Sequence, residues 1–398
     1  MRDRPPVRQP TRPLPSISGA PSPPPFLLLR SQAPTPQFLK NLSNLANVSG
    51  PAVPYAVLKA PGASATKTTL AVIERERDQT MSTPIAIAER IPVGTPMPVV
   101  SFSPVELSVP GRAVDLQVRV SAPATGSDLP IILLSHGHGN SNYLSSLRGY
   151  SPLADFYAAH GFVVIQPTHL DSNTLNLRSE PEGPLFWRSR AEDMHAILDQ
   201  IDQIEAAVPG LNGRLDKSRI AAVGHSMGGH TVGLLAGMRV TDPSDGTEVS
   251  LADPRVKAGV LLAPPGTSAN LAAFASEHYP VFRYGSFTEM TTPALVVVGD
   301  QDVSPNFSDR VAWRSDAYFL SPGPKCLLTL FGARHALGGV SGYDAAETAD
   351  ENPERVAVVQ RLTWAYLRTA LYADDPAWAA ASAALMDAPD PLGRVECK

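Results

Sequence analysis

The sequence predicts an α/β protein with a mostly parallel central sheet, helices on both faces and an antiparallel hairpin at the N-terminal end of the sheet. Short, continuous apolar runs alternate with stretches of helical periodicity from about residue 98 onward. Two segments that alternate apolar and polar residues precede them. Because parallel strands are joined by crossovers that cover the sheet, this order favours helices on both faces.

The first two predicted strands form the hairpin. Their sequences, VVSFSPVELSV and AVDLQVRVS, have the period of two expected for a half-buried strand and flank the turn Pro110-Gly111. The runs PIILLS (130–135) and FVVIQP (162–167) are continuously apolar, which is typical of strands buried on both faces. A helix between them is expected to end near His160-Gly161.

The second half of the chain continues the alternation. Residues 190–208 repeat apolar side chains at helical spacing and predict one amphipathic helix. The final helix is predicted to begin at Pro353, with Asn352 as its N-cap. The remaining predicted strands are RIAAVGH (219–225), VKAGVLLA (256–263), PALVVVG (293–299) and KCLLTLF (325–331).

Residues 1–80 differ in composition from the rest. They contain 14 of the 40 prolines and carry a net charge of +6, whereas residues 81–398 carry −11. Such a segment buries too little apolar surface to offset chain entropy, so we predict that 1–80 is disordered and 81–398 is one catalytic domain. Three interpretations of the segment stay open: an interaction tail or linker, a transit-like presequence, or an extension upstream of a start at Met81.

Composition excludes several classes of protein. The net charge of −5 gives no basic surface for nucleic acid, and no apolar run is long enough to span a bilayer. The cluster 26–29 is too short for a signal peptide, so we expect a cytoplasmic protein. Cys326 lies in a predicted core strand and is expected to be an inert buried thiol rather than the partner of Cys397. The sequence specifies no protein partner.

The strongest motif is Gly224-His225-Ser226-Met227-Gly228-Gly229, between a predicted strand and a predicted helix. A G-x-S-x-G turn in this position is the nucleophile elbow, in which a tight bend exposes the serine. Ser226 is therefore the predicted nucleophile. His225 is expected to point away from the site and to be structural.

A serine nucleophile needs a base, and the base needs an orienting carboxylate. Asp302 follows the strand ending at 299, and His335 follows the strand ending at 331. The carboxyl ends of parallel strands share one edge, and the order Ser, Asp, His is the one expected for such a sheet. We predict a triad of Ser226, His335 and Asp302, with Asp300 as the alternative carboxylate.

Backbone N–H groups must also stabilise the oxyanion that forms during acyl transfer. We predict the amides of Met227 and of His138, the latter in the glycine-rich loop after residue 135. His136 and His138 form an H-x-H pair with no nearby third ligand, so no metal is predicted. Asn142 replaces the third glycine of a dinucleotide fingerprint, so no cofactor is predicted.

The substrate is expected to be a small-molecule ester. Loops after residues 167 and 265 leave the same edge of the sheet and carry several aromatic residues. We predict that Trp187 and Tyr284 contact the substrate.

The run LSHGHGNSNYLSSLRGYSPLADFYAAHGFVVIQPTHLDS, followed by RIAAVGHSMGG, resembles α/β-hydrolases related to dienelactone hydrolases, chlorophyllases, platelet-activating-factor acetylhydrolases and cutinase-like polyester hydrolases. The resemblance implies the α/β-hydrolase fold, with Ser226, Asp302 and His335 at the triad positions and His138 and Met227 at the oxyanion-hole positions. Chlorophyllases typically carry arginine where Met227 stands. The acetylhydrolases place their acid after the strand matching 256–263, where this chain has Ala263-Pro264-Pro265.

These expectations together describe a serine esterase that works through an acyl-enzyme. Two alternatives stay open at this point: an acyltransferase or non-ester hydrolase using the same triad, and a non-catalytic ligand-binding protein that retains the fold.

Overall fold

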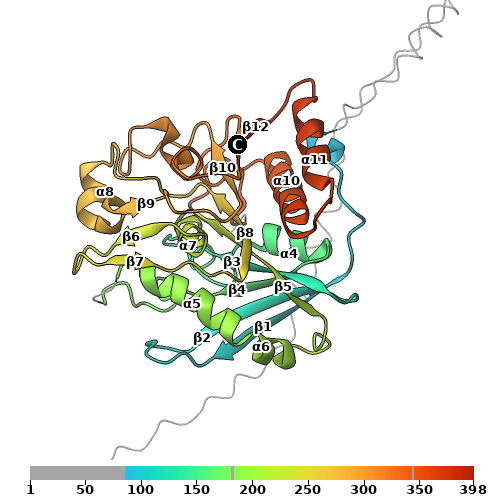
Figure 1. Ribbon diagram of the computed structural model, residues 1–398, viewed down its shortest axis with the longest axis horizontal. Coiled ribbons are helices and arrows are strands. Elements are labelled where there is room, and N and C mark those ends of the chain that lie inside the picture. The colour runs from blue at the N-terminus through green and yellow to red at the C-terminus, as the bar shows by residue number, and fades with distance from the viewer. Residues whose placement is uncertain (1–85, 181–182, 343–344) are drawn as a thin grey trace, which may run out of the picture. The chain divides into compact units, whose positions relative to one another are not determined.

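The computed structural model describes residues 86–180, 183–342 and 345–398. Its centre is a nine-stranded sheet in the order β1-β2-β4-β3-β5-β8-β10-β11-β12 (Figure 1). The six strands from β4 to β11 in that order pair in parallel. The strands span β1 (Val99–Leu107), β2 (Leu116–Pro123), β3 (Leu129–Ser135), β4 (Val163–Pro167), β5 (Leu215–His225), β8 (Val256–Leu262), β10 (Ala294–Gly299), β11 (Lys325–Leu330) and β12 (Gly393–Cys397).

The predicted fold class is confirmed. β1 and β2 form the expected antiparallel hairpin, and β2 also pairs antiparallel with β4. The far edge was not foreseen: the helix predicted to be the last is followed by a further helix and by β12, which pairs antiparallel with β11. The parallel strands are therefore flanked by antiparallel pairs on both sides.

Two apolar cores, one on each face of the sheet, hold the fold together. Along β3 the side chains of Ile131 and Leu133 enter one core, and those of Ile132 and Leu134 enter the other. This alternation is the reason that β3 reads as a continuous apolar run. Helices α5 (Trp187–Asp199), α6 (Ile201–Ala207) and α7 (Met227–Leu235) cover the first core, and α3 (Ile87–Arg90), α4 (Ser151–Ala159), α10 (Pro353–Leu371) and α11 (Ala377–Met386) cover the second.

Shorter elements lie between the main strands. They are β6 (Arg239–Thr241), β7 (Glu248–Ser250) and β9 (Gly285–Ser286), which form a small antiparallel sheet, together with α8 (Ala273–His278), α9 (Asp316–Phe319) and the 3₁₀ helices η1 (Pro280–Arg283) and η2 (Val311–Ser315). The two 3₁₀ helices supply Phe282 and Arg314 to the cavity described below.

The single helix predicted for 190–208 is two helices. The chain leaves the helical conformation at Gln200, whose φ and ψ are −108° and 22°, and α6 begins at the next residue. Ile197, Ile201 and Ile204 are nevertheless all buried in the same core. Because the apolar face continues through the break, hydrophobic periodicity could not reveal it.

The start of α10 agrees with its sequence signals. The Asn352 side chain accepts a hydrogen bond from the Arg355 N–H at 2.9 Å, and Pro353 occupies the first turn. The cap satisfies a backbone donor that the helix itself cannot satisfy.

The expectation of an inert thiol at Cys326 was wrong. β12 pairs with β11 in a register that places Cys397 directly opposite Cys326, and the two form a disulfide. The prediction failed because the strand formed by 393–397 was not recognised. The cytoplasmic location stays a prediction.

The predictions made for residues 1–80, including disorder and the boundary at residue 81, lie outside the described residues. Within the described ranges, no helix combines the length and apolar character that crossing a bilayer requires.

Candidate active site

Ser226 lies at a sharp turn between β5 and α7. Its φ of 54° and ψ of −116° are unusual for a residue with a side chain, as expected for a nucleophile elbow. A Cβ atom at Gly224 would lie 2.1 Å from the Gly228 carbonyl oxygen, and one at Gly228 would lie 2.2 Å from the Ser135 carbonyl oxygen. The glycines of the motif are therefore required by close backbone contact.

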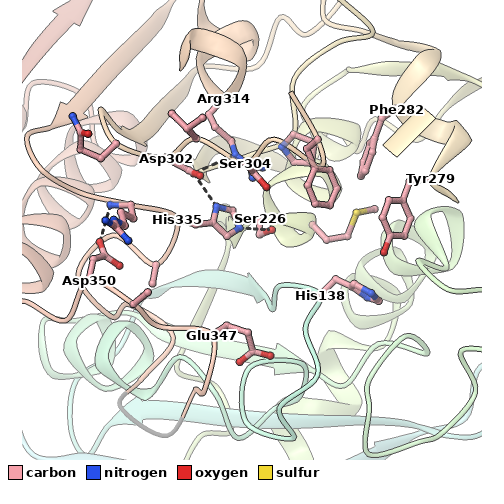
Figure 2. A pocket seen from close by; sticks show the side chains of 18 of the residues that line it. His138, Ser226, Tyr279, Phe282, Asp302, Ser304, Arg314, His335, Glu347 and Asp350 are labelled. Carbon is pink, nitrogen blue, oxygen red and sulfur yellow. Dashed lines mark hydrogen bonds and ion pairs between the residues drawn. The ribbon is translucent and has the colours of Figure 1, made fainter. Parts of the chain in front are cut away.

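The structure brings Ser226, His335 and Asp302 together from three loops (Figure 2). The Ser226 Oγ lies 2.9 Å from His335 Nε2, and His335 Nδ1 lies 2.8 Å from Asp302 Oδ2. Asp302 follows β10 and His335 follows β11, at the edge of the sheet where β5 ends. With Nδ1 donating to the carboxylate, Nε2 is free to accept the serine proton.

The Asp302 carboxylate is buried and paired with a second cation. Arg314 Nε lies 3.2 Å from Asp302 Oδ2, and both side chains are almost fully buried. Burial alone would raise the pKa of Asp302, but the Arg314 guanidinium and the His335 ring outweigh burial and hold this pKa below its usual range. Asp302 therefore stays ionised at neutral pH.

Asp300, the alternative carboxylate, has a different role. Its Oδ1 accepts a hydrogen bond from the Gly332 N–H at 2.7 Å. This contact joins the turn after β10 to the turn after β11. No hydrogen bond joins Asp300 to His335 in the described structure.

The two predicted oxyanion-hole residues, Met227 and His138, line the same cavity as Ser226. Among the described residues, neither backbone N–H has a hydrogen-bond acceptor. Met227 is the first residue of α7, where N–H groups have no partner within the helix. Neither amide is therefore used in a hydrogen bond within the described part of the chain.

The loop that carries His138 is held by contacts that the sequence did not predict. The His138 ring bonds Asp171 Oδ2 at 2.9 Å, and Asp171 pairs with the fully buried Arg190. Arg190 also donates to the His136 carbonyl oxygen. Burial works against the charge of Asp171, but Arg190 and His138 more than compensate and lower its pKa.

Glu347 holds the next part of this loop. Its Oε1 accepts hydrogen bonds from the N–H groups of Asn140 at 2.7 Å and Ser141 at 2.9 Å. Glu347 also lines the cavity beside Ser226. No local motif marks this residue, because its partners are about 200 positions away in the sequence.

The cavity around Ser226 has a volume of about 560 Å³. One side is apolar and aromatic, with Tyr279 and Phe282, and the opposite side is polar, with Asp350 (Figure 2). Glu347 lies between the two sides, next to the loop that carries His138. Other lining residues are Leu185, Met227, Pro265, Gln301, Asp302, Val303, Ser304, Phe307, Arg314, Arg334, His335, Ala336 and Ala349.

Neither of the two predicted substrate-contacting residues lines the cavity around Ser226. Trp187 lines a second cavity of about 480 Å³, which shares Leu185 and Tyr279 with the first. Tyr284 is exposed and lines neither of these cavities. The structure thus brings Trp187 to an adjoining cavity and does not bring Tyr284 to the site.

A second Ser-His-Asp arrangement lies beneath the site. The Ser135 Oγ is 2.9 Å from His169 Nε2, and His169 Nδ1 is 2.8 Å from Asp193 Oδ2. All three residues are buried and line neither cavity, so a substrate cannot reach Ser135. Burial and the nearby Arg190 keep the pKa of His169 well below its usual value.

The two histidines of the H-x-H pair have separate partners. His136 Nδ1 donates to the Gly137 carbonyl oxygen at 2.7 Å, whereas His138 bonds Asp171. Across the described ranges, no group of three His, Cys, Asp or Glu side chains is arranged to hold a metal ion.

Comparison with known proteins supports the resemblance read from the motifs. Residues 131–396 match the model of the alpha/beta hydrolase family. The chain is 32% identical over 153 residues to cutinase 2 of Thermobifida cellulosilytica, a match covering 38% of this chain and 47% of that enzyme. It is 28% identical over 214 residues to cutinase est1 of Thermobifida alba, covering 46% of this chain and 63% of that one.

A further relative is the platelet-activating factor acetylhydrolase of Cavia porcellus, 28% identical over 143 residues, which cover 27% of this chain and 32% of that enzyme. The first-named cutinase is thus matched over about half of its length. The family model spans most of the described chain, including the nucleophile elbow and the turns after β10 and β11. The chain therefore belongs to the alpha/beta hydrolase family.

Proposed function

We propose that this protein is a carboxylic ester hydrolase that works through an acyl-enzyme on Ser226. The observation that carries the proposal is the unbroken hydrogen-bonded path from Ser226 Oγ through the His335 ring to the ionised Asp302, in a cavity open to solvent. The relatives named cutinase and acetylhydrolase support ester bonds as the substrate class.

In the first half of the reaction, Ser226 Oγ forms a bond to the ester carbonyl carbon while His335 Nε2 takes the hydroxyl proton. Asp302 stabilises the imidazolium that results. The bond from carbon to the alcohol oxygen then breaks, and His335 returns its proton to the departing alcohol. In the second half, water attacks the acyl-enzyme by the same route and releases the acid and the free serine.

The negative charge that develops on the carbonyl oxygen needs donors fixed in advance. We assign this role to the amides of Met227 and His138, because both residues line the Ser226 cavity and neither backbone N–H has an acceptor among the described residues. Each such donor is worth about 3 kcal/mol of transition-state stabilisation in well-studied hydrolases. The Asp171 contact keeps His138 in place.

The two sides of the cavity suggest how a substrate lies. We assign the apolar acyl group to the aromatic side beside Tyr279 and Phe282, and the more polar alcohol part to the side beside Asp350. Trp187 then contacts only substrates long enough to pass Leu185 and Tyr279 into the adjoining cavity. We assign no substrate contact to Tyr284.

The test is a fluorophosphonate probe combined with a panel of aryl esters. Wild-type protein should be labelled at Ser226 and should hydrolyse the esters. The Ser226→Ala variant should not be labelled, and its kcat should be about 10⁴- to 10⁶-fold lower. Ser304→Ala is the matched control, because Ser304 lines the same cavity but has no contact with His335. Unchanged turnover in Ser226→Ala would exclude the proposed nucleophile.

A further inference from the structure

Three buried groups join the oxyanion loop to the loop that carries His335. The Gly137 N–H lies 2.9 Å from the Tyr150 Oη, which lies 2.9 Å from His225 Nδ1. The other ring nitrogen, His225 Nε2, lies 2.7 Å from the carbonyl oxygen of His335. Tyr150 and His225 are buried, with 0% and 2% of their surface exposed.

The direction of each hydrogen bond follows from the chemistry of the groups. The His335 carbonyl oxygen can only accept, so His225 Nε2 carries the proton and donates. Burial, reinforced by the nearby His335, lowers the pKa of His225 to about 3, so the ring is neutral and Nδ1 is an acceptor. Tyr150 must then donate its hydroxyl proton to Nδ1 and accept the hydrogen bond from Gly137.

Burial also raises the pKa of Tyr150, so its hydroxyl keeps the proton that this arrangement needs. Every donor and acceptor in the path is used once, with a single consistent orientation. A buried polar network that is fully satisfied in only one way fixes the groups at its ends.

The ends of this path lie beside the groups that the proposed reaction uses. Gly137 immediately precedes His138, and His225 immediately precedes Ser226. The path ends at the backbone carbonyl oxygen of His335 itself. The backbone of Gly137 packs closely against Tyr150, because a Cβ atom added at Gly137 would lie 2.8 Å from the Tyr150 Oη.

We propose that Tyr150 and His225 are positioning residues: their hydrogen bonds set the distance between the oxyanion loop, the nucleophile and the catalytic histidine. This inference rests on the proposed function at Ser226. Neither side chain touches the substrate, so both act on the rate of the chemical step and leave substrate binding nearly unchanged. Tyr150 and His225 therefore belong to the buried side chains that support the triad without taking part in the reaction.

The test begins with Tyr150→Phe, which removes one oxygen and leaves the ring in place. The Gly137 N–H and His225 Nδ1 lose their partner, and kcat should fall about 10- to 100-fold, because small misplacements of reacting groups have effects of this size. KM should stay within about twofold, because the variant removes no contact to bound substrate. The rate of Ser226 labelling by a fluorophosphonate should fall in parallel with kcat.

The matched control is Tyr157→Phe. Tyr157 lies in α4, the helix that Tyr150 immediately precedes, and is equally buried. Its hydroxyl makes one hydrogen bond, at 2.8 Å to the Thr363 hydroxyl on α10, away from the site. Both variants lose one buried hydroxyl, so both should lose stability, but only Tyr150→Phe should lose kcat. Equal losses of kcat in the two variants would overturn the positioning role.

His225 supplies a second test that does not depend on Tyr150→Phe folding. His225→Gln retains a donor toward the His335 carbonyl and should keep more of kcat than His225→Leu, which retains none. If wild type is active and labelled while all of these variants match its kcat, the positioning inference fails and the proposed function stands. If wild type neither turns over esters nor is labelled, the proposed function fails.

Discussion

Replacing Asp302 and Asp300 separately by asparagine tests which of the two carboxylates orients His335. In Asp302→Asn the side chain keeps its shape but loses its charge 2.8 Å from His335 Nδ1. Opposite unit charges about 4 Å apart interact by about 4 kcal/mol at an effective dielectric constant of 20, which corresponds to about 10³ in rate. An amide can also select the wrong imidazole tautomer, so we expect kcat to fall about 10³- to 10⁴-fold.

Asp300→Asn is the matched control, two residues away. Among the described residues, the side chain of Asp300 accepts a hydrogen bond only from the Gly332 N–H, and an amide oxygen can accept that hydrogen bond equally well. We expect kcat within about threefold of wild type. Ester hydrolysis at saturating substrate measures both variants. The reasoning is refuted if Asp300→Asn is the inactive variant or if Asp302→Asn keeps its kcat.

Measurements of stability separate the effect of Asp302→Asn on catalysis from its effect on the buried ion pair with Arg314. Asp302→Asn leaves the buried Arg314 without its counter-charge, and breaking a buried pair in this way typically costs about 3–5 kcal/mol. Adding Arg314→Leu removes the unpaired charge and should recover stability in denaturant unfolding. It should not recover kcat, because the imidazolium still lacks a carboxylate.

Two further predictions concern the whole domain. Burial lowers the pKa of His230 to about 3, so only the unfolded state takes up this proton just below pH 6.5, and stability is lost as pH falls. The free energy of unfolding should fall by about 2 kcal/mol between pH 7 and pH 5 from this residue, and urea titrations of His230→Gln should show a correspondingly smaller fall. The Cys326–Cys397 disulfide closes a sequence separation of 71 residues. Replacing both cysteines by serine should lower the free energy of unfolding by about 4 kcal/mol in the chain-entropy model; an unchanged denaturation midpoint would show that the cross-link adds nothing.

Much of the site could be predicted because its signals are local. The elbow at Ser226 depends on glycines two residues on either side, and Asp302 and His335 each follow a recognisable apolar strand. Once the sheet is known to be parallel, its carboxyl edge must gather these turns. The cap at Asn352 was predictable for the same reason, since it acts on the adjacent turn.

The contacts that hold the site could not be predicted, because none of them follows a local sequence pattern. Arg314 reaches Asp302, Glu347 reaches the amides after Gly139, and Tyr150 reaches His225. Nothing in the local sequence of an arginine, glutamate or tyrosine specifies such a partner. The disulfide was missed similarly, because its register depends on an edge strand that has only weak periodicity.

The buried trio of Ser135, His169 and Asp193 has a consequence for recognising enzymes by shape. Its two hydrogen bonds match those at Ser226 to within 0.1 Å. A three-residue template would therefore find two sites in this protein, although only one admits a ligand. A hydroxyl, an imidazole and a carboxylate that are buried together satisfy one another's hydrogen bonds. The same arrangement of Ser, His and Asp can therefore be a structural part of a protein core.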